Sequence, residues 1–462
     1  MNNPEKDPRR FRLVISITVF ILFTMLIVAI LLLIGVLPHK NDPTEDTSSA
    51  STTGAPVTEV TEKPEASETP KTEKPEKEVR VEQSIIENMA SATEVKGITV
   101  TDEMLEKGIL NEGNKTRLMN VMERAARGEA ITIAYIGGSI TAGSLANPQE
   151  TGCFAALTTK WWSDTFPKAK INYVNAGIGA TDSWVGAHRA ADDVNSKKPD
   201  LVVCEFAVND GQGWNQETYD SLLRTLLTGP SEPAVVALMI AHKYGSFADK
   251  HAPVAFKYEL PIITYSALLT QKLVSWEKVG NADGTHPDNP GHQLIAHLLT
   301  SYYRKVLSEI NDTKPGEYKV PKLSGSLTRC RYTNADILYS DELTADSSIG
   351  FEAGPVYKIL NHDQGWKTQT GGFLTFTVEA REIGVIWLQR NSDPNGKYAT
   401  YELFIDGESK GLLPGVAESW GTHLEYKTEM LGNEPATHTI ELRQAEGTTG
   451  SEFEILGIGV SR

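Results

Sequence analysis

Apolar and polar positions follow two different patterns along the chain, and each pattern predicts its own kind of folded region. Between residues 114 and 310, short runs that are apolar throughout are separated by stretches with apolar residues at helical spacing. The apolar runs lie at 131–136, 171–177, 200–210, 234–241 and 260–265, and the helical stretches include 114–127, 184–196, 216–227 and 293–310. Fully apolar strands that alternate with helices indicate a parallel sheet covered on both faces. We therefore expect residues 83–314 to form an α/β domain.

The C-terminal region, 315–462, has a different pattern. Its apolar runs, such as 373–378, 384–389 and 398–405, are alternating or rich in β-forming residues. Turn sequences such as Asp406-Gly407 separate them, and no helix of convincing length interrupts. Many short strands with glycine-rich turns predict an all-β sandwich.

One segment near the N-terminus, Leu13–Leu37, is 25 residues long and contains no charge and no proline. About 20 apolar residues in a helix span a bilayer core, whereas the apolar region of a signal peptide has roughly 7–15. Arginines precede the segment at positions 9, 10 and 12, so the positive-inside rule places residues 1–12 in the cytoplasm. We expect a single-pass signal anchor in the cell membrane, with the body extracellular. A cleaved, unusually long signal peptide is the alternative, and it would also export the body.

Residues 38–82 are built mainly from Thr, Ser, Pro, Glu and Lys and contain no Phe, Trp or Tyr. Such a segment buries too little apolar surface to offset the entropy of ordering it. Prolines and charges keep it extended, to a reach on the order of 100 Å when stretched. We expect a disordered spacer.

The charge of the chain is −16, with +2 on residues 1–12 and −4 on 39–80, which leaves −14 for the remainder. An acidic body argues against nucleic acid as a partner, because neutralising phosphates needs a basic surface. Three cysteines at 153, 204 and 330 are too few for a disulfide scaffold and lack metal-site spacing. We expect neither a metal nor a cofactor.

Four short motifs fall where the predicted strands end or where the last helix begins. They are GGSIT at 137–141, NAGIGAT at 175–181, VND at 208–210 and DGTHP at 283–287. Alone, each is weak: a serine after two glycines is usually a tight turn, and a lone asparagine usually caps a helix. In open α/β sheets, however, functional residues gather at the carboxyl ends of the strands. The four motifs in this order therefore predict one site.

In these motifs the sequence resembles the SGNH hydrolases, or GDSL-like esterases, over roughly residues 114–310. The GGSIT variant is similar to that of an exported, carbohydrate-esterase-like branch. The resemblance implies a flavodoxin-like parallel sheet, with Ser139 as nucleophile, Gly179 and Asn209 as oxyanion donors, and Asp283 and His286 as its partners. The C-terminal sequences ELFIDGE and EFEILGIGVSR resemble jelly-roll-like modules that accompany carbohydrate esterases.

The match departs from the family's pattern at one position. Many relatives carry two glycines where this chain has Gly179-Ala180. The oxyanion donor is a backbone N–H, which alanine also supplies, but a left-handed backbone at Ala180 would be costly. The resemblance assigns the oxyanion N–H to Gly179, and Ala180 is the alternative donor.

The chemistry also stands without the resemblance, because ester hydrolysis needs an activated nucleophile, a base and donors for the oxyanion. His286 would take the proton of Ser139, and Asp283, three residues upstream, would accept the Nδ1–H of His286. The N–H groups of Ser139 and Gly179 and the amide of Asn209 would then bind the oxyanion.

Other residues compete for these roles. Ser144 is a rival nucleophile but lies further past the strand end, and Asp288 is a rival to Asp283 but follows His286. His292 and His297 are expected to be structural. No G-x-S-x-G elbow, H-E-x-x-H or P-loop occurs.

Two further sets of residues could either contact the substrate or have no part in binding it. The groups His188-Arg189 and His242-Lys243-Tyr244 could reach a cleft or be solvated loop residues, the interpretation we favour. Three tryptophans, Trp184, Trp214 and Trp276, could stack on a sugar ring or fill the core or its rim.

The function that follows is a membrane-tethered extracellular serine esterase that removes acyl groups, acetyl above all, from a polysaccharide. The glycan is inferred from the tether, the β-module and the GGSIT branch, and the catalytic residues do not bear on it. The alternatives are a lipase or lysophospholipase-type esterase, a non-catalytic glycan-binding surface protein, and an acyltransferase that uses the same serine.

Overall fold

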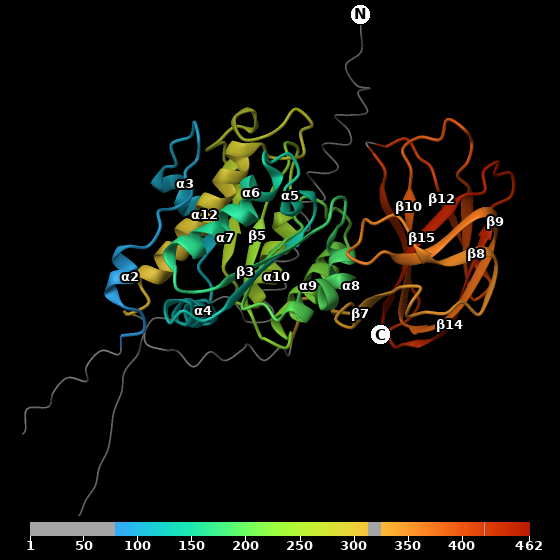
Figure 1. The fold of residues 1–462 in the computed structure, drawn as a ribbon, viewed down its shortest axis with the longest axis horizontal. Helices are drawn as coiled ribbons and strands as arrows, with labels where there is room; N and C mark the ends of the chain where they lie inside the picture. Colours follow the sequence, from blue (N-terminus) through green and yellow to red (C-terminus); the bar gives the residue numbers. More distant parts are fainter. Residues whose placement is uncertain (1–78, 313–324, 420) are drawn as a thin grey trace, which may run out of the picture. The chain divides into compact units, whose positions relative to one another are not determined.

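The computed structural model describes residues 79–312, 325–419 and 421–462 (Figure 1), all within one compact unit, Pro75–Arg462. The predicted cytoplasmic tail, anchor helix 13–37 and nearly all of the spacer lie outside these residues. Within the described ranges, no helix combines the length and the apolar character needed to cross a bilayer.

The first sheet has six strands in the order β1-β6-β5-β4-β2-β3. The strands are β1 (Ile109–Asn111), β2 (Ile131–Gly137), β3 (Ile171–Gly177), β4 (Leu201–Glu205), β5 (Ala234–Met239) and β6 (Ile262–Thr264). Each of the five predicted apolar runs coincides with one strand of β2–β6, although β2 extends one residue past its run, to Gly137. These five are parallel and stand in the flavodoxin-like order 2-1-3-4-5.

The expectation of a purely parallel sheet is wrong at one edge. Strand β1 pairs with β6 in the antiparallel direction, so the sheet is mixed. The physical reason is that β6 would otherwise expose a row of unpaired N–H and C=O groups, and a preceding segment of chain covers that edge.

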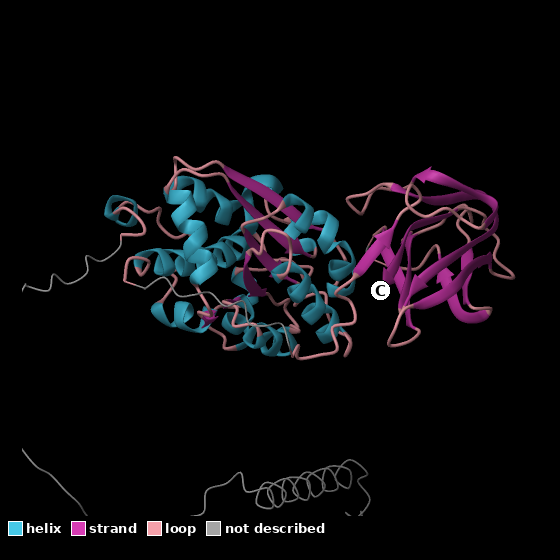
Figure 2. Cartoon of the chain, turned by 90° about the horizontal axis from the view of Figure 1, so that it is seen from below, coloured by secondary structure: helices cyan, strands magenta, loops and turns pink. Residues whose placement is uncertain are grey.

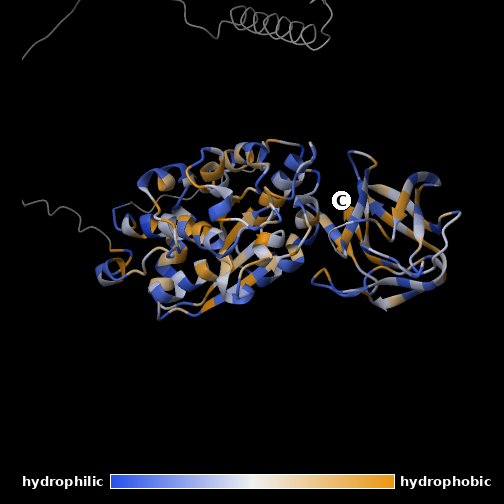
Figure 3. Cartoon of the chain, turned by 90° about the horizontal axis from the view of Figure 1, so that it is seen from above, coloured by the Kyte–Doolittle hydropathy of each residue, from blue (hydrophilic) through white to orange (hydrophobic). Residues whose placement is uncertain are grey.

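Helices cover both faces of this sheet because successive residues of a strand point to opposite sides. Ile133 and Tyr135 of β2 pack in one apolar cluster, and Ala134 and Ile136 pack in another. The first cluster includes residues of α4 (Thr116–Ala126), α7 (Phe154–Thr165) and α12 (Asn289–Ser308). The second includes residues of α8 (Ser183–Asp193), α9 (Asn215–Leu227) and α10 (Ala248–Lys257). In Figure 3 the apolar colour gathers on strands inside this region.

The remaining helices are short. They are α2 (Gln83–Glu87), α3 (Asp102–Gly108), α5 (Ser139–Ala142), α6 (Gln149–Gly152), α11 (Tyr265–Thr270) and the 3₁₀ turns Asn195–Lys197 and Trp276–Lys278.

The C-terminal part is all-β over its described residues, as predicted (Figure 2). Its strands are β7 (Ala335–Leu338), β8 (Ser347–Pro355), β9 (Gln364–Ala380), β10 (Glu382–Gln389), β11 (Thr400–Ile405), β12 (Glu408–Pro414), β13 (His423–Met430), β14 (Ala436–Gln444) and β15 (Phe453–Ser461). Seven of them follow the order β12-β11-β14-β9-β15-β10-β13, with β7 paired to β15 and β8 to β9. All these pairs are antiparallel, around an apolar core of their own. The jelly-roll-like arrangement stays a prediction.

The two folded parts share an apolar cluster. Trp184 of α8 is fully buried in this cluster, which also includes Ile386 and Leu456 of the β-domain. A Cβ at Gly384 would stand 2.3 Å from the Trp184 ring, and one at Gly459 would stand 2.7 Å from it. The two glycines therefore admit the indole, and the β-domain docks directly on the helix that follows the NAGIGAT motif.

Candidate active site

Ser139, His286 and Asp283 form a continuous line of hydrogen bonds at the carboxyl edge of the first sheet. The Ser139 Oγ lies 2.8 Å from His286 Nε2, and His286 Nδ1 lies 2.6 Å from Asp283 Oδ2. Because a carboxylate can only accept, Nδ1 carries the proton, which leaves Nε2 of the neutral ring to accept from the serine hydroxyl. This geometry suits general-base activation of Ser139.

The Asp-Gly-Thr-His sequence holds the acid and the base on one side of a turn. Asp283 Oδ1 accepts the backbone N–H of Thr285 at 3.0 Å and of His286 at 3.1 Å. Gly284 has φ of +74°, a conformation that glycine adopts without a Cβ penalty. Burial opposes ionisation of Asp283, but the hydrogen bonds from His286 and Thr285 outweigh it, and the pKa of the carboxyl is lowered. Asp283 thus stays charged beside the imidazole.

The two predicted oxyanion residues lie beside the nucleophile. A Cβ built on Gly179 would stand 3.9 Å from the Ser139 Cβ, and one built on Gly138 would stand 2.3 Å from Asn209 Oδ1. The Asn209 amide therefore approaches the nucleophile turn only because residue 138 has no side chain. Ala180 has φ of +61°, so the left-handed backbone flagged from the sequence is present.

A buried carboxyl that the sequence analysis did not single out joins these loops. Glu205, the last residue of β4, is 1% exposed, and Thr141 Oγ1 donates to its Oε2 at 3.3 Å. Burial raises the pKa of Glu205 to about 7, against the opposing hydrogen bonds from Thr141 and from the N–H groups of Val208 and Gly138. The carboxyl thus sits under the turn of Ser139 and the loop of Asn209. The available signal was a charge in the middle of the apolar run 200–210, whose two other charges, Asp200 and Asp210, lie at its ends.

Neither interpretation of His188 and Arg189 was correct, because both are buried on α8. The Arg189 guanidinium donates to the carbonyls of Ala176 at 2.6 Å and Gly137 at 3.0 Å, and to Asp193 at 2.8 Å. It therefore ties together the ends of β3 and β2. These residues face the sheet and the β-domain because α8 packs between them.

The rival residues have structural contacts. Ser144 follows α5, where its carbonyl lies 3.2 Å from His292 Nε2. His292 is fully buried, which lowers its pKa to about 4. His297 Nδ1 contacts the Thr93 carbonyl at 2.6 Å, and Asp288 caps α12 by accepting from Gly291 N–H at 3.0 Å.

The tryptophans are mostly internal. Trp184 and Trp276 are buried, and their indole N–H groups donate to Glu382 at 2.9 Å and to the Asn281 carbonyl at 3.0 Å. The core interpretation is correct for these two. Trp214 is half-buried, with its ring centroid 6.3 Å from that of Tyr426.

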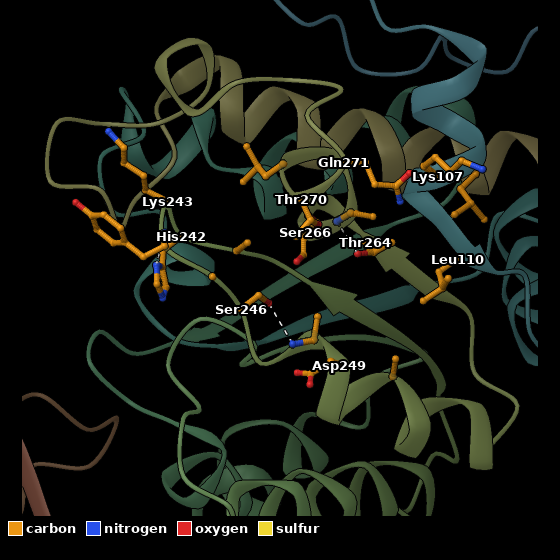
Figure 4. A pocket seen from close by; sticks show the side chains of 18 of the residues that line it. Lys107, Leu110, His242, Lys243, Ser246, Asp249, Thr264, Ser266, Thr270 and Gln271 are labelled. Atoms are coloured by element: carbon orange, nitrogen blue, oxygen red, sulfur yellow. Dashed lines mark hydrogen bonds between the residues drawn. The ribbon is translucent and has the colours of Figure 1, made fainter. Parts of the chain in front are cut away.

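A cavity of about 720 Å³ lies at the same carboxyl edge, beyond the ends of β5 and β6 (Figure 4). Its lining includes His242, Lys243, Tyr244, Ser246, Ser266 and Gln271, whereas Ser139 and His286 do not line it. The backbone N–H of Lys243 donates to the Gly284 carbonyl at 2.9 Å, which joins this rim to the Asp283–His286 turn. Tyr244 is 80% exposed, and its ring lies 3.0 Å from a Cβ built on Gly284. The 242–244 group thus borders a cavity next to the predicted site.

The flavodoxin-like sheet agrees with the resemblance to the SGNH hydrolases, and similar solved structures show the family. A two-domain esterase (CEX) active on acetylated mannans is 30% identical, with a TM-score of 0.69, over 77% of this chain and 98% of that chain. The same kind of esterase co-crystallised with mannopentaose is 29% identical, with a TM-score of 0.67, over 77% and 97% of the two chains. No protein-family model and no curated protein matches. The chain belongs to the family of SGNH-like carbohydrate esterases.

Proposed function

We propose that this protein is a serine esterase that removes acetyl groups from a polysaccharide through a covalent acyl-enzyme. The observation that carries the proposal is the line of hydrogen bonds from Ser139 through His286 to Asp283. A serine hydroxyl is a weak nucleophile on its own, and a neutral imidazole held in one tautomer by a carboxylate activates it.

The reaction proceeds in two halves. In the first, Ser139 Oγ attacks the acetyl carbonyl as His286 Nε2 takes its proton, and the sugar oxygen then leaves with that proton. In the second, a water attacks the acetyl-Ser139 ester as His286 takes a proton from it, and acetic acid leaves as that proton passes to Ser139 Oγ; the acid then ionises to acetate in solution. Both tetrahedral intermediates place an oxyanion at the donors of Ser139, Gly179 and Asn209, where losing one donor typically costs about 3 kcal/mol, roughly a hundredfold in rate.

An acetylated, mannan-like polysaccharide is the proposed substrate. The relative of similar two-domain build acts on acetylated mannans. Apolar side chains such as Leu110 and Leu269 line the cavity next to the Asp283–His286 turn together with Ser246, Ser266 and Lys107, so its lining does not choose between a sugar and a lipid. The proposed substrate therefore rests on the relative.

The setting of the enzyme is proposed from the sequence alone. The apolar segment 13–37 would anchor the chain in the cell membrane, and the spacer would hold the body outside the cell. The net charge of the body would suit a neutral, esterified glycan better than an anionic polymer.

Acetate release by the full chain in detergent tests the proposal. We expect hydrolysis of p-nitrophenyl acetate and of acetylated mannan, little activity on long-chain esters, and a loss of at least about 10³-fold in Ser139→Ala. Ser144→Ala, on the next turn of chain, is the matched control and should keep the wild-type rate. Full activity in Ser139→Ala would refute the nucleophile, and a preference for long-chain esters would refute the substrate.

A further inference from the structure

Tyr426, on β13 of the β-domain, reaches across the domain interface to the loops that carry the oxyanion residues. Its hydroxyl donates to Asp182 Oδ2 at 2.6 Å, and its ring stacks on Trp184 with centroids 4.2 Å apart and planes at 6°. Burial and the Asp182 carboxylate raise the pKa of Tyr426, which keeps the hydroxyl a donor.

Asp182 directly follows the predicted oxyanion segment Gly179–Thr181 and is the N-cap of α8. Its Oδ1 accepts the backbone N–H of Trp184 at 3.1 Å and of Val185 at 3.2 Å, as an N-cap does. Its Oδ2 is the acceptor for Tyr426 and also for Asn215 Nδ2 at 3.0 Å. The Asp182 carboxylate therefore caps the helix that follows the oxyanion segment and also binds Tyr426 of the β-domain.

The same set of bonds extends to the loop of Asn209. Asn215 Oδ1 accepts the N–H groups of Gly211 at 3.1 Å and Gln212 at 2.8 Å. Asp210 Oδ1 accepts the N–H of Ser183 at 2.7 Å. Asp182 and Asp210 thus cross-link the two loops that hold Gly179 and Asn209, so a shift of Asp182 would move both.

The β-domain holds Tyr426 in a fixed place. Trp184, under the tyrosine ring, donates its indole N–H to Glu382 of β10 at 2.9 Å. The second oxygen of Glu382, a side chain with no exposed surface, lies 3.3 Å from His188 Nε2, and Thr428 of β13 donates to the first. Buried polar groups from both domains thus fix the Tyr426–Trp184 stack, and this holds the Tyr426 hydroxyl against Asp182.

We propose that the β-domain positions the oxyanion donors, and that the Tyr426 hydroxyl, through Asp182, is the contact by which it does so. Tyr426 is a positioning residue and does not touch the substrate. The inference rests on the proposed esterase function. Its physical basis is that an oxyanion donor acts only at 2.7–3.1 Å from the place where the charge develops, so a small displacement of the loop removes much of the effect.

Tyr426→Phe in the full chain is the direct test, because it deletes one oxygen and keeps the stack on Trp184. Both halves of the reaction use the same oxyanion donors, so we expect kcat on p-nitrophenyl acetate to fall roughly tenfold while KM changes less than twofold. This small substrate also separates positioning from any glycan binding by the β-domain. Tyr401→Phe is the matched control: its hydroxyl is buried in the β-domain core without a hydrogen-bond partner among the described residues, and kcat should be unchanged.

A double-mutant cycle identifies the contact. Asp182→Ser keeps a good N-cap for α8 but is too short to reach Tyr426. If the two residues act through one hydrogen bond, the double variant will lose little more activity than the worse single variant. Additive losses, or an undiminished kcat in a folded Tyr426→Phe, would overturn the inference while the esterase proposal stands. A wild-type chain without esterase activity would overturn both.

Discussion

The side chain of Asn209 lies directly against Gly138. A Cβ built on residue 138 would stand 2.3 Å from Asn209 Oδ1. Gly138 has φ of −87°, which does not require a glycine. The absence of a side chain at residue 138 is therefore set by the asparagine that approaches the nucleophile turn, and the backbone conformation has no part in it.

Gly138→Ala should therefore displace the Asn209 amide and lower kcat by about 10²–10³-fold, the effect of losing one oxyanion donor. Steady-state hydrolysis of p-nitrophenyl acetate measures the loss, with circular dichroism to show that the variant folds. Gly213→Ala is the control, because a Cβ there meets no atom within 4 Å. An active, folded Gly138→Ala would show that the Asn209 amide is not needed.

Asp283→Asn tests the orientation of the base. Asparagine keeps the shape but offers an N–H to His286 Nδ1, which favours the wrong tautomer, so kcat should fall by about 10³–10⁴-fold. Asp288→Asn is the matched control, since asparagine is an equally good N-cap for α12. A loss of less than tenfold in Asp283→Asn would remove Asp283 from the proposed triad.

Tyr244→Ala tests whether the cavity beyond β5 and β6 takes part in binding the polymer. The exposed ring is placed to stack on a sugar next to the Asp283–His286 turn. We expect KM for acetylated mannan to rise several-fold, with a much smaller effect on p-nitrophenyl acetate. Tyr357→Ala, an exposed tyrosine of the β-domain, is the comparison. Equal losses on both substrates would mean that Tyr244 supports the turn and not the polymer.

Glu205 predicts a pH dependence of stability. Its folded pKa of about 7 lies above the ordinary carboxyl value, so the folded state binds the proton more tightly than the unfolded state does. The free energy of unfolding should therefore fall as pH rises from about 4.5 to about 7, by on the order of 3 kcal/mol from this group, and level off above that range.

Glu205→Gln removes this titration, so the variant should gain stability relative to wild type as pH rises through that window. Urea denaturation at pH 5 and pH 8 measures it, and the comparison with wild type isolates Glu205 from Asp182, whose pKa burial raises to about 6. Glu106→Gln, at an exposed side chain, is the control. A stability difference between wild type and Glu205→Gln that is the same at both pH values would contradict the assignment.

The parts of the site that the sequence predicted lie where local pattern determines structure. The strands β2 to β6 were visible because buried strands are apolar on both faces, and the motifs were visible because they follow those strands. Ser139, Asn209 and the Asp283–His286 turn could be named because strand ends in a parallel sheet converge whatever the connecting helices are. The Asp-x-x-His spacing lies within one turn and needs no tertiary information.

The supporting residues could not be found that way. Glu205 looked like an isolated charge and Arg189 like a solvated loop residue, because the partners of both lie on other strands and loops. The edge strand β1 is too short to have a period of its own.

By itself, the sequence determined the α/β and all-β regions, the acidic charge and the residues that meet at the sheet edge, because these depend on periodicity and on neighbours a few positions apart. Only the tertiary structure decided which residues from distant parts of the chain fix the loops at that edge. Tyr426 and Asp182 are 244 positions apart and meet because Trp184 enters the face of the β-domain at Gly384 and Gly459. Such a contact depends on the docking of the surfaces of two folded domains, and no local pattern of residues encodes it.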